Sequence, residues 1–297
     1  MKILFHNYSN STSTEPLYLH NALQKCGVES FIWADPNMSA YDVFDTTKPD
    51  VFVTHFKTFS QDIFQYMQQN SGCSLVLNVT GASQSQIESI EKELEKAGIK
   101  VAFLFTNSFE NKLKTKLKLH NLYPAADLFN LPPQQNVKSV LPEAVVSDKF
   151  DENVENYIGE KDVFNLLYIT EGDKDSNFDI RVNVRNLSQL YKVYDKMCLV
   201  GGNDLCCSQL FFDMAMYCNN PVIRSSDQEG FNKFLENVFQ ETGKHENNLL
   251  GEIRNQIKDR HTPFHRAWRF MKFLGDKDAM SKIDSVKNQL PTLIKDM

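Results

Sequence analysis

Asp213 is the only carboxylic acid in the mostly apolar segment "SQLFFDMAMYC" (208–218). The apolar residues predict a helix whose first turn contains Ser208, Gln209 and Leu210. Amides at the start of a helix, together with the positive end of its dipole, hold anions such as phosphates. Asp213 lies more than one turn further on, where its carboxylate could accept hydrogen bonds from the hydroxyl groups of a ligand. The alternative is that Asp213 simply forms the polar side of an amphipathic helix.

A glycine and several cations extend this candidate anion site. Gly202 closes the apolar run "KMCLVGG", directly before the turn that leads to the helix. Arg181, Arg185 and Arg224 lie within or shortly after other apolar runs. The planar guanidinium group suits phosphate oxygens, but each of these arginines is equally well explained as a surface charge.

Polar residues also follow the apolar runs in the first half of the chain. His55 ends the run "DVFVTHF", where it could bond a sugar or act as a base, or be a buried histidine with satisfied ring nitrogens. The other candidates also follow an apolar run directly. They are Asn7, Ser9, Asn10, Ser11, Thr12 and Ser13 in "HNYSNSTSTEP", Thr80 and Gly81 in "NVTGAS", and Asn107 and Glu110 in "TNSFEN". The first of these loops is also explained as a plain surface turn.

The elements that must position these residues alternate between strands and helices. Short apolar runs predict buried strands at 2–6, 29–34, 50–56, 74–80 and 100–107. Helices between them include "PLYLHNALQKCG", which begins with proline and ends with glycine, and "SQSQIESIEKELEKAG", which begins with a capping serine. This alternation predicts βαβ units and a doubly wound α/β sheet.

A second sheet is predicted after a segment rich in prolines and acids. That segment, 122–162, indicates a domain junction near 130–160. Strands are then predicted at 163–170, 178–184, 196–202 and 220–226, with helices near 187–194, 208–218, 228–241 and 246–259. The predicted organisation is a first domain at 1–150, a second at 151–275, and a C-terminal helix at 276–297 that crosses back to the first domain. Two open sheets predict a ligand crevice at the carboxyl ends of their strands.

Composition limits the class of protein. With 297 residues, 41% of them hydrophobic and 24% charged, the chain can bury a large core. A net charge of −6 argues against a protein whose entire surface binds nucleic acid or anionic lipid, although a local basic cleft is compatible with this charge. The apolar run near the start is too short for a signal peptide, and no later run could span a membrane. These features predict a cytoplasmic protein without membrane insertion, in the host cytoplasm if it is viral.

Several familiar motifs are missing from the sequence. The six cysteines lack CxxC spacing, which predicts reduced core thiols. No GxGxxG follows the first predicted strand and no GxxxxGK[ST] occurs, which argues against NAD enzymes and P-loop kinases. No DxD motif lies in the loops assigned to the site, so we expect no metal.

The order of motifs in the second half gives a more specific indication. From 190 onward the chain reads "LYKVYD", "KMCLVGG", "NDLCCS", "QLFFDMAMYCNNPVI" and "RSSDQEG", and 259–275 reads "DRHTPFHRAWRFMKFLG". The first series resembles the second domain of retaining GT-B glycosyltransferases, with their "EGFG" and "EAMACGTPVI" motifs. The last segment is similar to the "HTYAHRAEQLL" ending of the CgeB-like group. This resemblance implies two Rossmann-like domains that face a central cleft.

The resemblance also implies roles for the candidates. The amides of Ser208 to Leu210, with Gly202 and the arginines, would hold the diphosphate of a nucleotide-sugar donor, and Asp213 would replace the family's glutamate on the ribose hydroxyls. The family has a second acid eight residues before its glutamate. In this chain Asp204, which lies nine residues before Asp213, would take that place. "CNNPVI" is one residue longer than "CGTPVI", and the family's Arg/Lys pair has no clean counterpart. In the first domain, His55 and Asn7 would be catalytic, and the other polar residues would bind the acceptor.

The activity that the resemblance implies is transfer of a hexosyl or pentosyl group from a nucleotide-diphosphate sugar, with retention of configuration and without a further cofactor. The sequence leaves the acceptor open among a small molecule, a glycan, a protein and a hydroxymethylated DNA base of a phage, so that nucleic acid is one of the partners considered. Two alternatives stay open: a nucleotide- or sugar-nucleotide-binding module without catalysis, and a sugar-nucleotide epimerase on the same fold.

Overall fold

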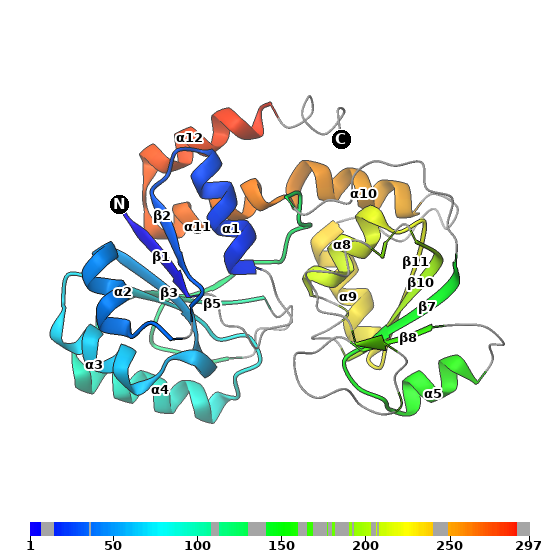
Figure 1. The fold of residues 1–297 in the computed structure, drawn as a ribbon, viewed down its shortest axis with the longest axis horizontal. Helices are drawn as coiled ribbons and strands as arrows, with labels where there is room; N and C mark the ends of the chain where they lie inside the picture. Colours follow the sequence, from blue (N-terminus) through cyan, green and yellow to red (C-terminus); the bar gives the residue numbers. More distant parts are fainter. Residues whose placement is uncertain are drawn as a thin grey trace. The chain divides into compact units, whose positions relative to one another are not determined.

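The computed structural model describes residues 1–6, 15–35, 37–107, 113–129, 141–159, 165–168, 177, 180–181, 190–191, 193–202, 206, 208–239 and 249–289. Contacts divide the chain into two compact units, each built on its own sheet (Figure 1). Of the described residues, unit 1 contains 1–6, 15–123 and 264–289, and unit 2 contains those from 124 to 263.

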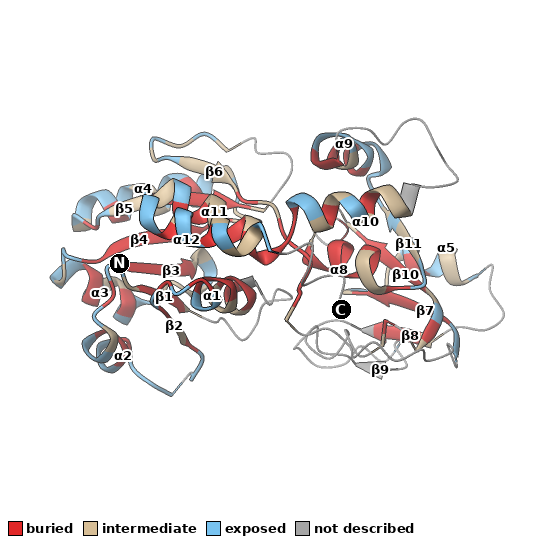
Figure 2. Ribbon diagram, turned by 90° about the horizontal axis from the view of Figure 1, so that it is seen from above, coloured by how far each residue is buried: buried red, intermediate tan, exposed pale blue. Residues whose placement is uncertain are grey.

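Unit 1 is built on a six-stranded parallel sheet. Its strands, in spatial order, are β2 (Ser30–Trp33), β1 (Ile3–His6), β3 (Val51–His55), β4 (Ser74–Asn78), β5 (Val101–Thr106) and β6 (Leu119–Asn121). The runs predicted as strands therefore do form the sheet, and Figure 2 shows its central strands as buried. The order reverses between β1 and β3, and a ligand site is expected beyond the carboxyl ends of strands at such a point.

Helices cover the sheet of unit 1. They are α1 (Glu15–Lys25), α2 (Ala40–Thr47), the short 3₁₀ helix η1 (Phe56–Thr58), α3 (Gln61–Gln69), α4 (Gln84–Ala97), α11 (Pro263–Leu274) and α12 (Lys277–Lys287). The caps that the sequence suggested for α4 are present. Ser83 and Gln86 form a capping box at its start, and Gly98, with φ of 66°, ends it in the left-handed conformation.

The two last helices belong to unit 1 (Figure 1, orange to red). Phe270 on α11 is fully buried, with its ring centroid 5.8 Å from that of Phe5 and 5.7 Å from that of Phe103. Trp268 Nε1 donates a hydrogen bond of 2.9 Å to Asp284 Oδ2, which joins α11 to α12. Both helices therefore belong to unit 1, whereas the sequence predicts that only 276–297 crosses back to the first domain.

Unit 2 is built on a five-stranded parallel sheet. Its strands, in spatial order, are β11 (Asn220–Ser225), β10 (Tyr194–Gly201), β7 (Leu141–Ser147), β8 (Asn165–Tyr168) and β9 (Ile180–Arg181). Its described helices are α5 (Glu152–Ile158), α8 (Gln209–Tyr217), α9 (Gln228–Phe239) and α10 (Leu249–Arg260). If the strands of this sheet are renumbered from 1 to 5 along the chain, starting at β7, their spatial order from β9 to β11 is 3-2-1-4-5. This is the strand order of one half of a Rossmann-like fold, and the order reverses between β7 and β10.

The central strand of this sheet, β7, lies inside the segment that the sequence predicts to be the domain junction. β7 reads "LPEAVVS", and its proline and glutamate break the apolar run that would have revealed it. Pro142 is the second residue of the strand and precedes the pairing with β8, which begins at Ala144. Ala144, Val145 and Val146 are fully buried and face the two cores of the unit. Contacts accordingly divide the chain at 123/124.

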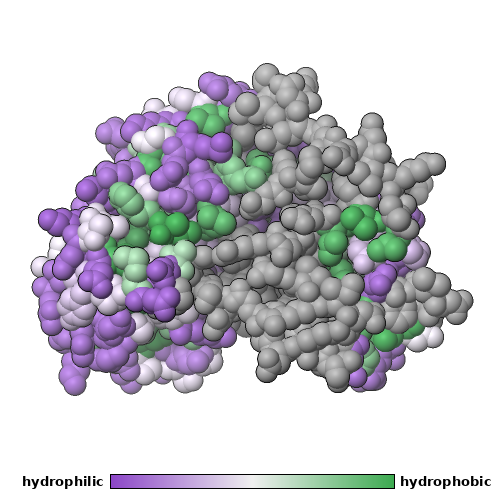
Figure 3. All heavy atoms as spheres, viewed as in Figure 1, coloured by the Kyte–Doolittle hydropathy of each residue, from purple (hydrophilic) through white to green (hydrophobic). Residues whose placement is uncertain are grey.

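The described surface carries few large apolar side chains. Those that are exposed are Met1, Met38, Tyr41 and Leu141. In Figure 3, the described surface of unit 1 that faces the viewer is mainly hydrophilic, with limited hydrophobic patches. None of the helices described here is both long and apolar enough to cross a membrane. A functional site is therefore best sought among polar groups at the strand ends.

Candidate functional site

At the carboxyl end of β3, His55 has both ring nitrogens engaged within unit 1. Its Nδ1 accepts a hydrogen bond from the amide of Lys57 (3.2 Å), so its Nε2 must carry the proton and donate to the carbonyl of Thr80 (3.2 Å). These bonds fix the neutral tautomer and hold the start of η1. A base at this position would first have to give up one of them, so the catalytic role of His55 stays a prediction.

Polar side chains join the ends of β4 and β5. The hydroxyl and the amide of Thr80 both donate to Asn78 Oδ1, at 2.6 and 3.0 Å, and Thr80 Oγ1 accepts from the amide of Asn107 at 2.9 Å. Asn107 Oδ1 in turn accepts from Arg266 Nη2 at 2.9 Å. Two predicted substrate-binding residues, Thr80 and Asn107, are thereby brought together and made rigid. The neighbouring Gly81 has φ of 77°, which favours glycine at this turn.

His6, at the end of β1, was not among the candidates from sequence. Its Nδ1 lies 3.0 Å from Thr54 Oγ1, and its ring stacks on Trp33 with centroids 4.5 Å apart. Burial lowers the pKa of His6 to about 4, against the opposing effect of Asp62. The imidazole is therefore neutral at pH 7. The signal that could have identified it is the one used for His55, a polar residue at the end of an apolar run.

Several predicted residues cannot be placed. Those outside the described residues are Asn7, Ser9, Asn10, Ser11, Thr12, Ser13, Glu110, Arg185 and Asp204. Arg181 lies in β9, and only its backbone belongs to the described part. Their predicted roles stay predictions.

The start of α8 is already capped by its own side chain. Ser208 is the N-cap, and its hydroxyl accepts a hydrogen bond of 3.2 Å from the amide of Leu210. Gln209 and Leu210 are buried, with exposures of 3% and 1%. A diphosphate that used the amide of Leu210 would thus have to displace the serine hydroxyl.

Asp213 lies in the interior of unit 2. Its Oδ1 accepts from the amide of Asp127 at 2.7 Å, and its Oδ2 accepts from Gln209 Nε2 at 3.3 Å. Tyr217, on the same helix, donates its hydroxyl proton to the carbonyl of Asp127 at 2.8 Å. Burial, followed by the charge of Asp127, raises the pKa of Asp213 well above its ordinary value. In this arrangement the carboxyl group binds a distant segment of the unit to α8.

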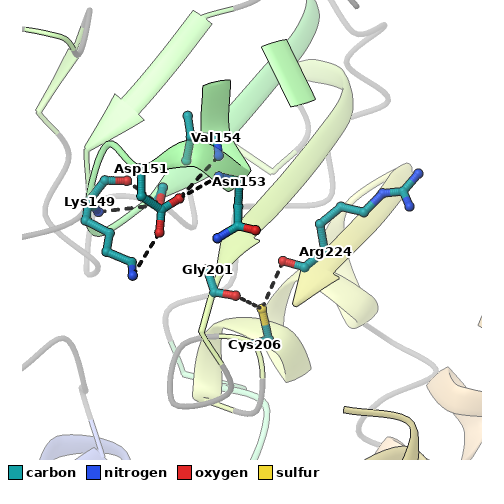
Figure 4. Close-up of polar contacts among 8 residues, drawn as sticks. Lys149, Asp151, Asn153, Val154, Gly201, Cys206 and Arg224 are labelled. Carbon is teal, nitrogen blue, oxygen red and sulfur yellow. Dashed lines mark hydrogen bonds and ion pairs between the residues drawn. The ribbon is translucent and has the colours of Figure 1, made fainter. Parts of the chain in front are cut away.

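The carboxyl ends of β10 and β11 are joined by a buried thiol (Figure 4). Cys206 Sγ lies 3.5 Å from the carbonyl of Gly201 and 3.5 Å from the carbonyl of Arg224. Gly202 follows at the end of β10, and a Cβ built there would meet Ser226 Oγ at 3.9 Å, an ordinary contact. The fold itself therefore accepts a side chain at Gly202.

A pocket of about 490 Å³ lies on unit 2. Its lining comes from α5, β10, β11 and the start of α9, and consists of Asn153, Asn156, Tyr157, Lys196, Val222, Arg224, Ser225 and Gln228. Arg224 is the predicted donor-site residue in this lining, and α8 contributes none of it. Across the described ranges, no three His, Cys, Asp or Glu side chains gather in a way that could hold a metal.

Comparisons with known proteins support the fold but not a family. No family model matches this sequence, and no curated protein is similar to it. Among solved structures, the chain is similar to Anabaena HepE in complex with UDP and glucose (10% identity, 93% of this chain and 99% of that chain, TM-score 0.51). It is also similar to S. aureus MnaA with UDP (12% identity, 94% of this chain and 97% of that chain, TM-score 0.50). A further similar structure is that of the glycosyltransferase SnogD from Streptomyces nogalater (11% identity, 92% of this chain and 99% of that chain, TM-score 0.46). The similarity to HepE and MnaA therefore shows the fold alone, which is the α/β GT-B fold with Rossmann-like domains.

Proposed function

We propose that this protein is a glycosyltransferase that moves a sugar from a nucleotide-diphosphate sugar to an acceptor. The observation that carries the proposal is the similarity of nearly the whole chain to a GT-B structure holding UDP and glucose, and to a second structure holding UDP. The motif order in 190–275, which resembles the CgeB-like group of retaining enzymes, supports the same activity and suggests retention of configuration.

For the donor, we propose a site at the carboxyl ends of β7 and β10, where the strand order of unit 2 reverses. Gly202 would let the diphosphate approach the backbone, and the first turn of α8 would stabilise the negative charge that develops on the departing diphosphate. The phosphate would replace the Ser208 hydroxyl at the amide of Leu210. Asp204 is proposed as the second acid.

For the acceptor, we propose the carboxyl edge of the sheet in unit 1, at Thr80, Gly81 and Asn107. The sequence predicts that the polar residues of 7–14, which lie outside the described ranges, also bind the acceptor. The hydrogen bonds among Asn78, Thr80 and Asn107 support this choice, because a fixed set of polar groups can orient a hydroxyl for attack without further ordering. The acceptor class stays open between a small molecule, a glycan, a protein and a hydroxymethylated DNA base.

Release of nucleotide from a panel of nucleotide sugars tests the activity. We expect slow hydrolysis of one donor without acceptor, at a rate unchanged by EDTA. Gly202→Ala should lower kcat/KM for that donor at least tenfold, because the fold accepts the methyl group while a diphosphate close to the backbone would not. The exposed Lys233→Gln on α9, whose side chain pairs with Glu229, is the control and should stay within twofold of the wild type.

Two other outcomes of the same assay would argue against transfer, and a third would argue only against the proposed position of the diphosphate. An epimerised donor without nucleotide release would indicate a sugar-nucleotide epimerase. Binding without any conversion of donor, with or without candidate acceptors, would indicate a binding module. Full activity of Gly202→Ala would contradict the proposed position of the diphosphate while leaving the transfer activity intact.

A further inference from the structure

The pocket of unit 2 has the size of a small-molecule site and a positive lining. Its volume of about 490 Å³ lies within the range of ligand pockets. Lys196 and Arg224 line it, and the described residues of its lining include no acidic side chain. Glu143 Oε1 lies behind the lining, 3.3 Å from Lys196 Nζ, and also accepts from the hydroxyl of Tyr157 at 2.6 Å. The buried carboxylate of Glu143 thus compensates the charge of Lys196.

Arg224 is the cation of this pocket whose positive charge is not balanced by a carboxylate among the described residues. Its side chain is exposed at the end of the edge strand β11, and its guanidinium makes no hydrogen bond or ion pair with any other residue in the described part of the chain. The contact of Arg224 with Cys206 uses the backbone carbonyl alone. Figure 4 shows the long side chain extending away from that contact. A guanidinium in this state is suited to bind a phosphate through paired N–H groups.

Neutral polar groups stand beside these cations. Asn153 and Asn156 are exposed, three residues apart on α5, and so lie on the same side of the helix. Their side-chain amides can donate to and accept from sugar hydroxyls. Val222 and the ring of Tyr157 add apolar surface, which suits the C–H face of a sugar ring.

We propose that this pocket binds a small sugar phosphate, with its phosphate on Arg224 and its hydroxyls on Asn153 and Asn156. Neither Gly202 nor any residue of α8 lines this pocket, so the proposal uses none of the groups to which we assign the diphosphate of the donor, although the sequence had also placed Arg224 there. The proposal therefore does not depend on glycosyl transfer, and a binding assay without nucleotide tests it independently.

Calorimetric titration of the full chain with glucose 6-phosphate provides the test. We expect saturable binding that is tighter than that of inorganic phosphate, and none for glucose alone. Arg224→Gln should weaken binding at least tenfold, because it removes the charge-assisted pair. Lys149→Gln removes an equally exposed cation outside the lining, one that is paired with Asp151 at 2.8 Å, and should change the affinity less than twofold.

Asn153→Leu provides a second, independent variant. The side chain is exposed, so the fold should tolerate the change, and the variant should lose most of the preference for glucose 6-phosphate over inorganic phosphate. Absence of binding by the wild type would overturn the proposal. So would equal affinities of the wild type and Arg224→Gln, or equal losses in Arg224→Gln and Lys149→Gln.

Discussion

Replacing Arg266 with Met is expected to lower the free energy of unfolding of unit 1 by about 3 kcal/mol. Arg266 is 2% exposed, and its Nη1 donates to the carbonyls of Leu122 and Tyr123, while its Nη2 donates to Asn107 Oδ1. Met keeps the apolar stem but leaves these acceptors without their donor, and each buried unsatisfied group costs about 1–3 kcal/mol. The same bonds hold Asn107, so acceptor binding should weaken together with stability.

Tryptophan fluorescence during urea unfolding measures this loss in unit 1 alone. The sequence has two tryptophans, Trp33 and Trp268, and both belong to unit 1. Lys272→Met is the matched control, since Lys272 is an exposed cation on the same helix whose Nζ lies 5.3 Å from the centre of the Trp268 ring. It should change the unfolding free energy by less than about 1 kcal/mol. Equal effects of the two substitutions would show that Arg266 does not clamp α11 to the chain near Tyr123.

Asp213→Ala is expected to destabilise unit 2 by about 2–3 kcal/mol, because the buried amide of Asp127 and the side chain of Gln209 lose their acceptor. Asp213→Asn keeps an acceptor for the amide of Asp127, and a rotated Gln209 amide can accept from the new Nδ2. We therefore expect the Asn variant to stay within about 1 kcal/mol of the wild type at pH 5. Urea unfolding followed by circular dichroism measures both variants. A normal stability of Asp213→Ala combined with lost nucleotide binding would instead support the ribose role predicted from the sequence.

The pH dependence of this effect has a defined sign. Burial raises the pKa of Asp213 in the folded protein above its ordinary value of 3.8, so the protonated carboxyl is favoured by the fold. The stability that the fold gains from the protonated Asp213 carboxyl is fully present below pH 3.8, and it is lost as the pH rises through the pKa of Asp213 in the folded protein. Asp213→Asn does not titrate, so its stability relative to the wild type should increase as the pH rises from 4. A pH-independent difference between the two proteins would contradict the buried, raised-pKa state of Asp213.

Local patterns were sufficient to predict the first five strands of unit 1, but not the short edge strand β6. The predicted strands are short apolar runs buried on both faces, and α4 carries its cap signals within its own sequence. β7 was missed because Pro142 and Glu143 interrupt its apolar pattern, although its position at the centre of the sheet buries the residues that follow. The domain junction predicted at 130–160 was drawn across this strand for the same reason.

The surroundings of the candidate site depend on contacts between distant segments, which a sequence pattern does not reveal. Asp213 looked like a ligand group because it is the only carboxylic acid on a mostly apolar helix, whereas the backbone amide that it binds belongs to Asp127, 86 positions away. Arg266 binds a carbonyl 144 positions away, and the motif around it gave no indication of that contact. His55 was recognised as a residue at a strand end, but its two hydrogen bonds depend on the turn that follows β3 and on Thr80.

A crystal structure with the nucleotide sugar that the turnover assay selects would test the central claim most directly. The account predicts the diphosphate beside Gly202 and at the first turn of α8, with the Ser208 hydroxyl displaced from the amide of Leu210. The sugar should point away from the pocket that Arg224 lines. A nucleotide bound in that pocket, or bound elsewhere with the cap of α8 unchanged, would contradict the donor site proposed for this protein.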